Sequence, residues 1–289
     1  MVLLGRDVAV GSDCSDAIIN AGRPGREGFA MILWIESQTT EVIALIVFML
    51  SYVATATVFL LAVLLRRRVV AAHMNAPMPV VLTPLTLITG LLIAFLASRV
   101  WSNLDHAGTY VEQEASALRA SILLSDSLPE GVSAAVHKSI KRYLEFIETT
   151  DWPDMAEGRA NLRRVPPGLP DAMRTLLSFK PTDPGQTFAQ QRAVVAIEQA
   201  LGVRRNRILL SEAAIQPIQW IVIIALSLLI QVTIAMVHIE RPVTVAVNLF
   251  TFATALAACL TLLLVNDRPF GAGGNTVRPD VLQDVGPIQ

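Results

Sequence analysis

The sequence predicts an all-α integral membrane protein in which four transmembrane helices carry a helical soluble domain between the second helix and the third. Three observations lead to this prediction. Hydrophobic residues make up 53% of the 289 residues and charged residues only 16%, whereas soluble domains carry roughly 25% charged residues. Four segments of 24 or 25 residues contain no charged side chain. Residues 102–212, between the second and third segments, hold 13 basic and 14 acidic residues, which is a soluble composition.

The four uncharged segments are long enough to cross a membrane. They comprise residues 42–65, 74–98, 213–237 and 242–266. A helix of this length is roughly 36 Å long, at about 1.5 Å per residue, and a hydrocarbon core is about 30 Å thick. Buried helices of soluble proteins are seldom uncharged over such a length, so we predict that all four segments span a bilayer. The predicted spans are residues 42–65, 79–98, 217–237 and 243–265.

Three of the segments contain residues that are unusual in hydrocarbon. The second segment has three prolines in its first half, so we expect that half to be kinked or partly unwound. Amide side chains occur in the last two segments, for example Gln231 and Asn248. Because an amide in hydrocarbon needs a hydrogen-bonding partner, we expect these side chains to face other helices rather than lipid.

The soluble stretch predicts helices and no strands. Apolar residues at helical spacing over residues 104–122 predict an amphipathic helix that continues the second span. Ser127, followed three residues later by Glu130, matches a capping box for the next helix, which should end before Asp151. A last helix from about Gly185 should run into the third span.

These elements divide the chain into five parts. The parts are an N-terminal tail (1–40), a first transmembrane helix pair (41–101), the soluble domain (102–212), a second transmembrane pair (213–267) and a flexible C-terminal tail (268–289). The first thirty residues contain five glycines among scattered charges, and Met31 opens the stretch that leads into the first span. Residues 1–30 are therefore either a disordered tail or a start-site artefact.

An even number of crossings places both termini and the soluble domain on the same side of the membrane. The arginine triplet at 66–68 follows the first span, and residues 31–41 before that span contain no Lys or Arg. The positive-inside rule then favours a cytoplasmic first loop and an extracytoplasmic domain. The arginines at positions 204–207, near the third span, favour the opposite orientation.

The sequence contains no motif of a metal site, a cofactor site or an enzyme active centre. Its four histidines lie far apart, its two cysteines form no cluster, and no catalytic signature occurs. The net charge of -1 offers no basic surface for nucleic acid. We therefore expect a protein that is not an enzyme, with no cofactor, no metal site and no nucleic-acid partner.

Four residues of the second span are candidates to line a pore. Ile88, Leu92 and Phe95 recur at helical spacing, and Arg99 follows at the end of the span. In a pore, apolar constrictions gate by dewetting and charged rings select ions. The alternative is ordinary packing, since stripes of large apolar residues occur in any membrane bundle.

Two acidic residues beyond that span are candidates for an ion-facing vestibule. Glu112 and Glu114 lie two residues apart, so on a helix their side chains point about 200° from one another and make separate contacts. The alternative is a solvated helix face.

Asp267 is a candidate for a charge clamp. It ends the fourth span beside Arg268, where the negative end of the helix dipole disfavours a carboxylate. Arg99, Arg204 and Arg207 belong to the same side of the membrane, so we expect one of them to pair with Asp267 and join the domain to the bundle. The alternative is an Asp267 that is exposed to water.

Several short motifs follow one another along the chain. They are His73-x-Asn75, Glu112 with Glu114, Leu128-Pro129, Asp151-Trp152-Pro153, Arg204-Arg205-x-Arg207, Pro217 with Trp220, and Asp267-Arg268-Pro269-Phe270-Gly271. This order, over residues 32–283, resembles the bestrophin-like family of bacterial membrane proteins, a family without an established activity. Its name implies a relation to bestrophins, which are oligomeric anion channels with four spans per subunit.

The resemblance implies an oligomeric ion channel or transport pore in the bacterial inner membrane. Its partners would be the lipid bilayer, further copies of the chain in a homo-oligomer, and inorganic ions. The alternative is a non-conducting, membrane-anchored sensor or scaffold whose helical domain binds a partner. Anion and cation flux into liposomes separates the two hypotheses.

Overall fold

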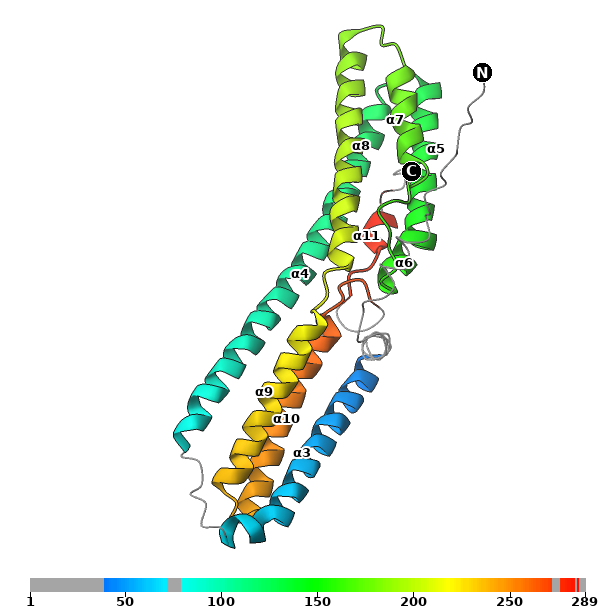
Figure 1. Cartoon of the computed structure of the whole chain (residues 1–289). Helices are drawn as coiled ribbons and strands as arrows, with labels where there is room; N and C mark the ends of the chain where they lie inside the picture. Colours follow the sequence, from blue (N-terminus) through cyan, green and yellow to red (C-terminus); the bar gives the residue numbers. More distant parts are fainter. Residues whose placement is uncertain (1–38, 72–78, 272–275, 284, 286–289) are drawn as a thin grey trace, which may run out of the picture. The chain divides into compact units, whose positions relative to one another are not determined.

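The computed structural model describes residues 39–71, 79–271, 276–283 and 285, and the regular elements within these ranges are helices (Figure 1). They are α3 (Thr40–Ala71), α4 (Leu82–Ser125), α5 (Glu130–Phe146), α6 (Trp152–Ala156), α7 (Leu169–Ser178), α8 (Pro184–Ser211), α9 (Pro217–Val237), α10 (Pro242–Asn266) and α11 (Asp280–Gln283). Helices α3, α4, α9 and α10 are long and apolar enough to cross a membrane. The predicted all-α membrane fold, with a helical domain between the second and third spans, is confirmed.

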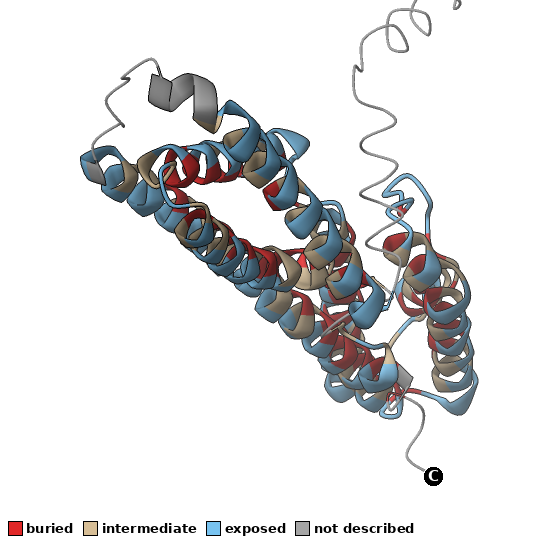
Figure 2. Cartoon of the chain, turned by 90° about the horizontal axis from the view of Figure 1, so that it is seen from below, coloured by how far each residue is buried: buried red, intermediate tan, exposed pale blue. Residues whose placement is uncertain are grey.

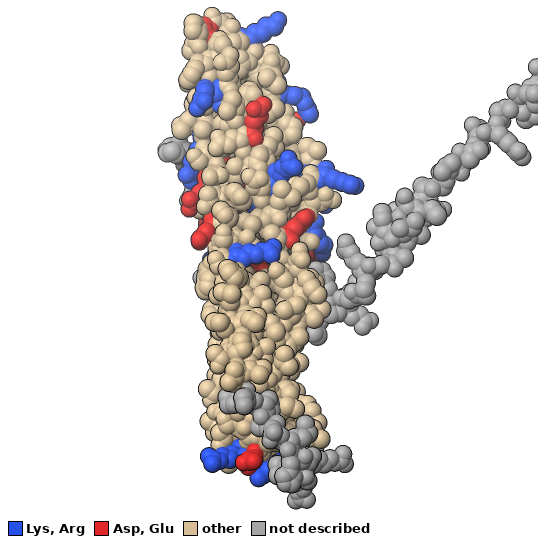
Figure 3. Space-filling model, turned by 60° about the vertical axis from the view of Figure 1, so that its left-hand side comes forward, with Lys and Arg blue, Asp and Glu red and all other residues tan. Residues whose placement is uncertain are grey.

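Hydrogen bonds between polar side chains join the membrane helices α3, α9 and α10. Thr55 of α3 donates from its hydroxyl to Oε1 of Gln231 in α9 at 3.1 Å, and the Tyr52 and Thr254 hydroxyls join α3 to α10 at 2.9 Å. The expectation that Gln231 faces another helix is therefore confirmed. On the face in Figure 3, a broad band of the surface carries no charged side chain, and charges gather at both ends of that band.

Helix α4 is one continuous helix of 44 residues that passes from the membrane bundle into the soluble domain. This confirms the predicted continuation of the second span. A 3₁₀ turn, Pro79–Val81, precedes α4, and Pro84 lies in its first turn, where a missing N–H costs no intrahelical bond. Among the described residues, the unwinding expected for the first half of the span is confined to that 3₁₀ turn.

The soluble domain is built on the long pair of α4 and α8, with α5 and α7 packed beside it (Figure 1). Figure 2 shows buried residues where these helices face one another. The loop before α7 approaches α5 so closely that a Cβ on Gly168 would lie 2.2 Å from the carbonyl oxygen of Ser139. Gly168 also has a φ of +92°, which is a glycine conformation. Both facts make glycine necessary at this contact.

Two expected helix boundaries are wrong. The capping box does not form: the N-cap of α5 is Pro129 without a side-chain cap, because the Ser127 N–H still bonds the Leu124 carbonyl in the last turn of α4. The helix expected from about Gly185 is α8, but it stops at Ser211 instead of running into α9. A short link, residues 212–216, separates α8 from α9.

The described part of the C-terminal segment packs on the domain. The Val277 N–H donates to the Pro269 carbonyl at 2.9 Å, and Leu282 and Val285 are each 2% exposed in the core of the domain. Nearly all of the N-terminal tail, and the His73-x-Asn75 pair, lie outside the described residues. The side of the membrane on which the domain lies stays a prediction.

Candidate functional site

The membrane half of α4 turns one face toward its own bundle and another away from it. The buried face consists of Thr89, Leu96 and Val100. Beside this face, roughly 100° around the helix, Ile88 is 57% exposed and Phe95 65% exposed, with Leu92 half-buried and Arg99 exposed. The four candidate pore residues therefore follow one stripe that α3, α9 and α10 of the same chain leave largely uncovered. Whether that stripe faces a pore stays a prediction.

The two candidate vestibule residues have different surroundings, as their helical spacing requires. Glu112 is exposed, whereas Glu114 is fully buried between α4 and α8. Only Glu112 can therefore face ions in solution. The vestibule role expected for Glu114 is corrected, because its carboxylate is enclosed by protein.

Glu114 forms a two-pronged ion pair with Arg207 of α8. Arg207 donates from Nε to Oε2 at 2.8 Å and from Nη2 to Oε1 at 3.2 Å. The Tyr143 hydroxyl of α5 donates to the same carboxylate. All three side chains are fully buried, so three helices meet at one carboxylate. A bidentate pair of this kind fixes both distance and orientation.

A second ion pair lies beside the first. Arg204, one helical turn before Arg207, donates from Nε to Oδ2 of Asp151 at 2.7 Å and from Nη2 to Oδ1 at 2.9 Å. Asp151 closes the π-helical turn Ile147–Asp151, which re-aims the chain between α5 and α6. Asp151 also lies 3.8 Å from Nη2 of Arg207. Glu114, Tyr143, Asp151, Arg204 and Arg207 thus form one buried charge cluster.

Aromatic rings extend this cluster to the segment that follows α10. The guanidinium of Arg207 lies 5.3 Å from the centre of the Trp152 ring. Trp152 in turn meets Phe270 edge to face, with ring centres 5.5 Å apart. A cation over an indole ring is an attractive contact. The cluster therefore connects α4, α5, α8 and the chain after the last span.

Four of the motifs that carry the family resemblance meet at this cluster. The acidic pair contributes Glu114, the acidic-Trp-Pro element contributes Asp151 and Trp152, and the arginine run and the closing motif contribute Arg207 and Phe270. They lie far apart in the sequence. The packing of the domain brings them together at one point.

The cluster is balanced in charge and closed to solvent. Burial, and next to it the Glu114 carboxylate, raises the pKa of the Tyr143 hydroxyl well above its usual value. Burial alone would lower the pKa of Arg207, but the Glu114 carboxylate raises it. Tyr143 therefore stays neutral and Arg207 stays charged at neutral pH. Such a site is suited to holding helices together and has no open position for a substrate.

The arginine clamp expected at Asp267 does not form: no ion pair joins Asp267 to Arg99, Arg204 or Arg207, all of which the structure describes. Arg204 and Arg207 are taken up by Asp151 and Glu114, because both arginines lie on the buried face of α8 and point into the domain. The carboxylate of Asp267 instead accepts the backbone N–H of Ile215, at 2.9 Å to Oδ1 and 3.2 Å to Oδ2. Pairing of Asp267 with Arg204 or Arg207 is therefore wrong.

Arg99 still acts on Asp267 through its charge. Burial raises the pKa of Asp267 to about 6, although the Ile215 N–H and the positive charges of Arg268 and Arg99 lower it. Asp267 is 3% exposed, which also excludes the alternative of a carboxylate in water. The expectation that something compensates this carboxylate is met by a backbone donor rather than by a guanidinium.

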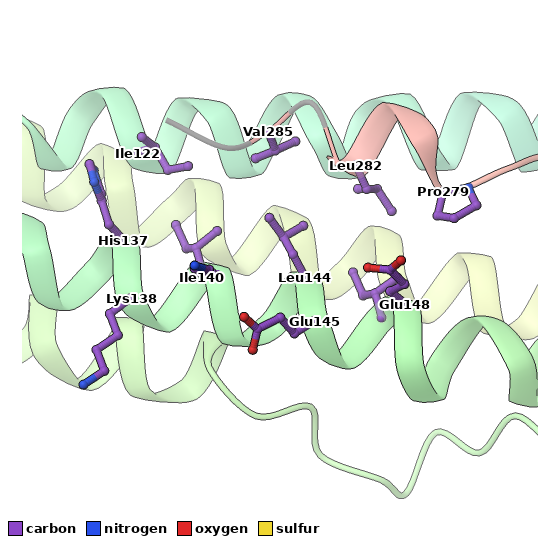
Figure 4. Close-up of a pocket in the computed structure, with 12 residues that line it drawn as sticks. Ile122, His137, Lys138, Ile140, Leu144, Glu145, Glu148, Pro279, Leu282 and Val285 are labelled. Atoms are coloured by element: carbon purple, nitrogen blue, oxygen red, sulfur yellow. The ribbon is translucent and has the colours of Figure 1, made fainter. Parts of the chain in front are cut away.

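A pocket of about 490 Å³ lies between α5 and the C-terminal segment (Figure 4). Its floor is apolar, with Ile140 and Leu144 on one side and Leu282 on the other. Lys138 and Glu145 both line it, so its charge selects neither anions nor cations. The pocket shows that the C-terminal segment is a wall of the domain.

Sequence reasoning missed the role of two residues in the cluster. Tyr143 has no motif of its own, yet a buried phenol needs a hydrogen-bonding partner, and that is the available signal. Asp151 was recognised only as part of a motif. Its partner Arg204 is 53 residues away, and no local pattern predicts such a pairing.

Known proteins resemble this chain in sequence family and in fold. The model of the Bestrophin-like domain family matches residues 40–282. A crystal structure of a bacterial bestrophin homologue from Klebsiella pneumoniae superposes with a TM-score of 0.61 at 11% identity, covering 84% of this chain and 95% of that chain. Two single-mutant forms of that homologue give TM-scores of 0.62 and 0.61, also at 11% identity, with 83% and 96% covered. No curated protein matches the chain.

Proposed function

The chain belongs to the bestrophin-like family, and from that premise we propose that it is an oligomeric ion channel whose pore is lined by one face of α4. The observation that carries the proposal is the uncovered stripe on the membrane half of α4. Ile88 and Phe95 are largely uncovered by the bundle of their own chain, and Arg99 continues the stripe. Around a symmetry axis, copies of this stripe would form apolar rings that gate by dewetting.

The charge of Arg99 at the end of the apolar stripe supports an anion-conducting pore. Arg99 lies at the domain end of the apolar stripe, and in an oligomer its copies would form a basic ring. Glu112 follows about 20 Å further along the helix, at about 1.5 Å per residue. It remains the candidate vestibule residue, because its side chain is exposed.

Flux measurements on purified protein in liposomes test the proposal. We expect anion flux from the unmodified chain and a larger flux from Ile88→Thr, because a polar ring removes the barrier to wetting. Ile221→Thr is the matched control: Ile221 is 61% exposed on α9, close to the 57% of Ile88, but lies outside the stripe.

Two outcomes contradict the proposal. An equal rise of flux in both variants would show that the α4 stripe does not line the pore. Absence of flux from every variant, at a folded and oligomeric state checked by light scattering, would favour the non-conducting sensor or scaffold with a partner-binding domain.

A further inference from the structure

The link between α8 and α9 is held by side chains from two other parts of the chain. Nδ2 of Asn103 in α4 donates to the Ala213 carbonyl at 3.2 Å. Asp267, directly after α10, accepts the Ile215 N–H. The link is the break at which the main helix of the domain gives way to a membrane helix. Both contacts therefore hold the link, residues 212–216, which we call the hinge because the domain helix ends and the membrane helix begins there.

Asp267 is the only one of these groups that titrates. Its carboxylate is buried, and the charged groups that act on it are Arg99 from α4 and Arg268 from its own segment. Within the link itself, Glu212 is exposed. A buried carboxylate facing one backbone donor is costly to ionise, even with two positive charges in its neighbourhood.

We propose that Asp267 is a proton-sensitive latch on this link, which keeps the link docked when protonated and favours its release when ionised. A protonated carboxyl still offers its carbonyl oxygen to the Ile215 N–H, so the docked contact survives protonation. Release would bring the ionised carboxylate into water, where it is fully solvated. The latch acts on the hinge whether or not the protein conducts ions.

The direction of the effect follows from proton linkage. The pKa of Asp267 in the docked state is about 6, whereas a carboxyl in water has a pKa of about 3.9. The docked state thus binds the proton more tightly, so the docked state gains stability as the pH falls from about 6 to about 4. A difference of about two pKa units allows roughly a 100-fold change in the ratio of released to docked link.

Hydrogen exchange of the full-length protein in detergent measures this ratio at the amides of residues 212–216. Protection factors, corrected for the intrinsic exchange rate at each pH, are compared at about pH 5 and about pH 7.5. We expect protection to be higher at the acidic pH by roughly tenfold or more. Asp267→Asn, a neutral side chain of the same shape, should give high protection at both pH values.

Two further variants make the test specific. Glu212→Gln removes the exposed carboxylate of the link and should leave the pH dependence unchanged. Arg99→Gln removes a charge that lowers the pKa of Asp267, so the midpoint of the transition should move to higher pH. The shift of the midpoint in Arg99→Gln still tests the proposal if Asp267→Asn does not fold.

The proposal is overturned if protection in the unmodified protein is independent of pH or lower at the acidic pH. It is also overturned if Asp267→Asn retains the pH dependence, or if Arg99→Gln leaves the midpoint in place. Because no ion flux enters the measurement, the latch and the channel stand or fall separately.

Discussion

The two halves of α4 are parts of one unbroken helix but have different surroundings. From Leu82 to Trp101 only Thr89, Leu96 and Val100 are buried. From Ser102 to Ser125 the buried residues are Ala107, Val111, Glu114, Ala115, Ala117, Leu118, Ser121 and Ser125. Three buried residues against eight show that the chain completes its own core around the domain half. The membrane half must find neighbours elsewhere.

The difference shows where each half takes its stability. The domain half is fixed by the buried charge cluster and by small side chains that let α8 approach. The membrane half is fixed by a few interhelical contacts, and lipid, a pore or a further copy must cover the rest. Substitutions in the domain half should therefore cost more stability than substitutions in the membrane half.

The largest loss is expected from Glu114→Gln. This change leaves the guanidinium of Arg207, fully buried, without its bidentate counter-charge. Breaking a buried pair by removal of one charge costs about 3–5 kcal/mol. Urea unfolding in detergent, followed by tryptophan fluorescence, measures the loss, since Trp152 packs against Arg207.

The matched control is the surface pair of Arg174 and Asp171, whose side chains are 79% and 40% exposed. Arg174→Met should cost no more than about 1 kcal/mol. The double change Glu114→Gln with Arg207→Met should be milder than the sum of the single changes, because no buried charge is then unpaired. Equal losses of stability in the buried and the surface pair would show that the buried charge cluster stabilises the domain no more than a surface ion pair does.

A smaller loss is expected from Gly168→Ala. Its φ of +92° alone costs a residue with a Cβ about 1–3 kcal/mol, and the clash with the Ser139 carbonyl adds to this. Gly131→Ala is the control, because nothing lies within 4 Å of a Cβ added there. Thermal unfolding measures the midpoint temperature of both variants. Equal midpoints would contradict the close contact between Gly168 and the Ser139 carbonyl.

The sequence predicted the features of α4 that depend on local spacing. Apolar residues at helical intervals predicted its continuation into the domain. The spacing of Glu112 and Glu114 predicted that their side chains point in different directions and make separate contacts. It could not predict which carboxylate each arginine meets, because Arg207 and Glu114 lie 93 residues apart and are brought together only by the packing of α8 on α4.

Asp267 shows the same limit at the hinge. The helix dipole and the nearby membrane both disfavour an unpaired carboxylate at Asp267, so the sequence predicted that a partner compensates it. Local reasoning offered the arginines, since guanidinium is the strongest partner for a carboxylate. The break of α8 at Ser211 frees backbone donors in the link, and one of them, the Ile215 N–H, takes that place. Pro217, which directly follows the link, is the local signal for the break, because the residue before a proline disfavours a helical conformation.

The smallest effect is expected for Thr55→Val in the membrane half. Thr55 is fully buried and its hydroxyl donates to Gln231, which joins α3 to α9. An interhelical hydrogen bond in a membrane contributes only about 0.6 kcal/mol on average, because alternative partners exist in the unfolded state. Unfolding in mixed micelles, with steric trapping or detergent titration, resolves a loss of this size.

Thr57→Val on the same helix is the matched control, because the Thr57 hydroxyl is exposed and bonds only the Val53 carbonyl of its own turn. A double-mutant cycle with Gln231→Met isolates the interaction between Thr55 and Gln231. A coupling of about 0.6 kcal/mol would sharpen the contrast with the several kcal/mol expected at Glu114. A coupling as large as that at Glu114 would contradict the contrast between the two halves, since the membrane half would then also depend on polar contacts within its own chain.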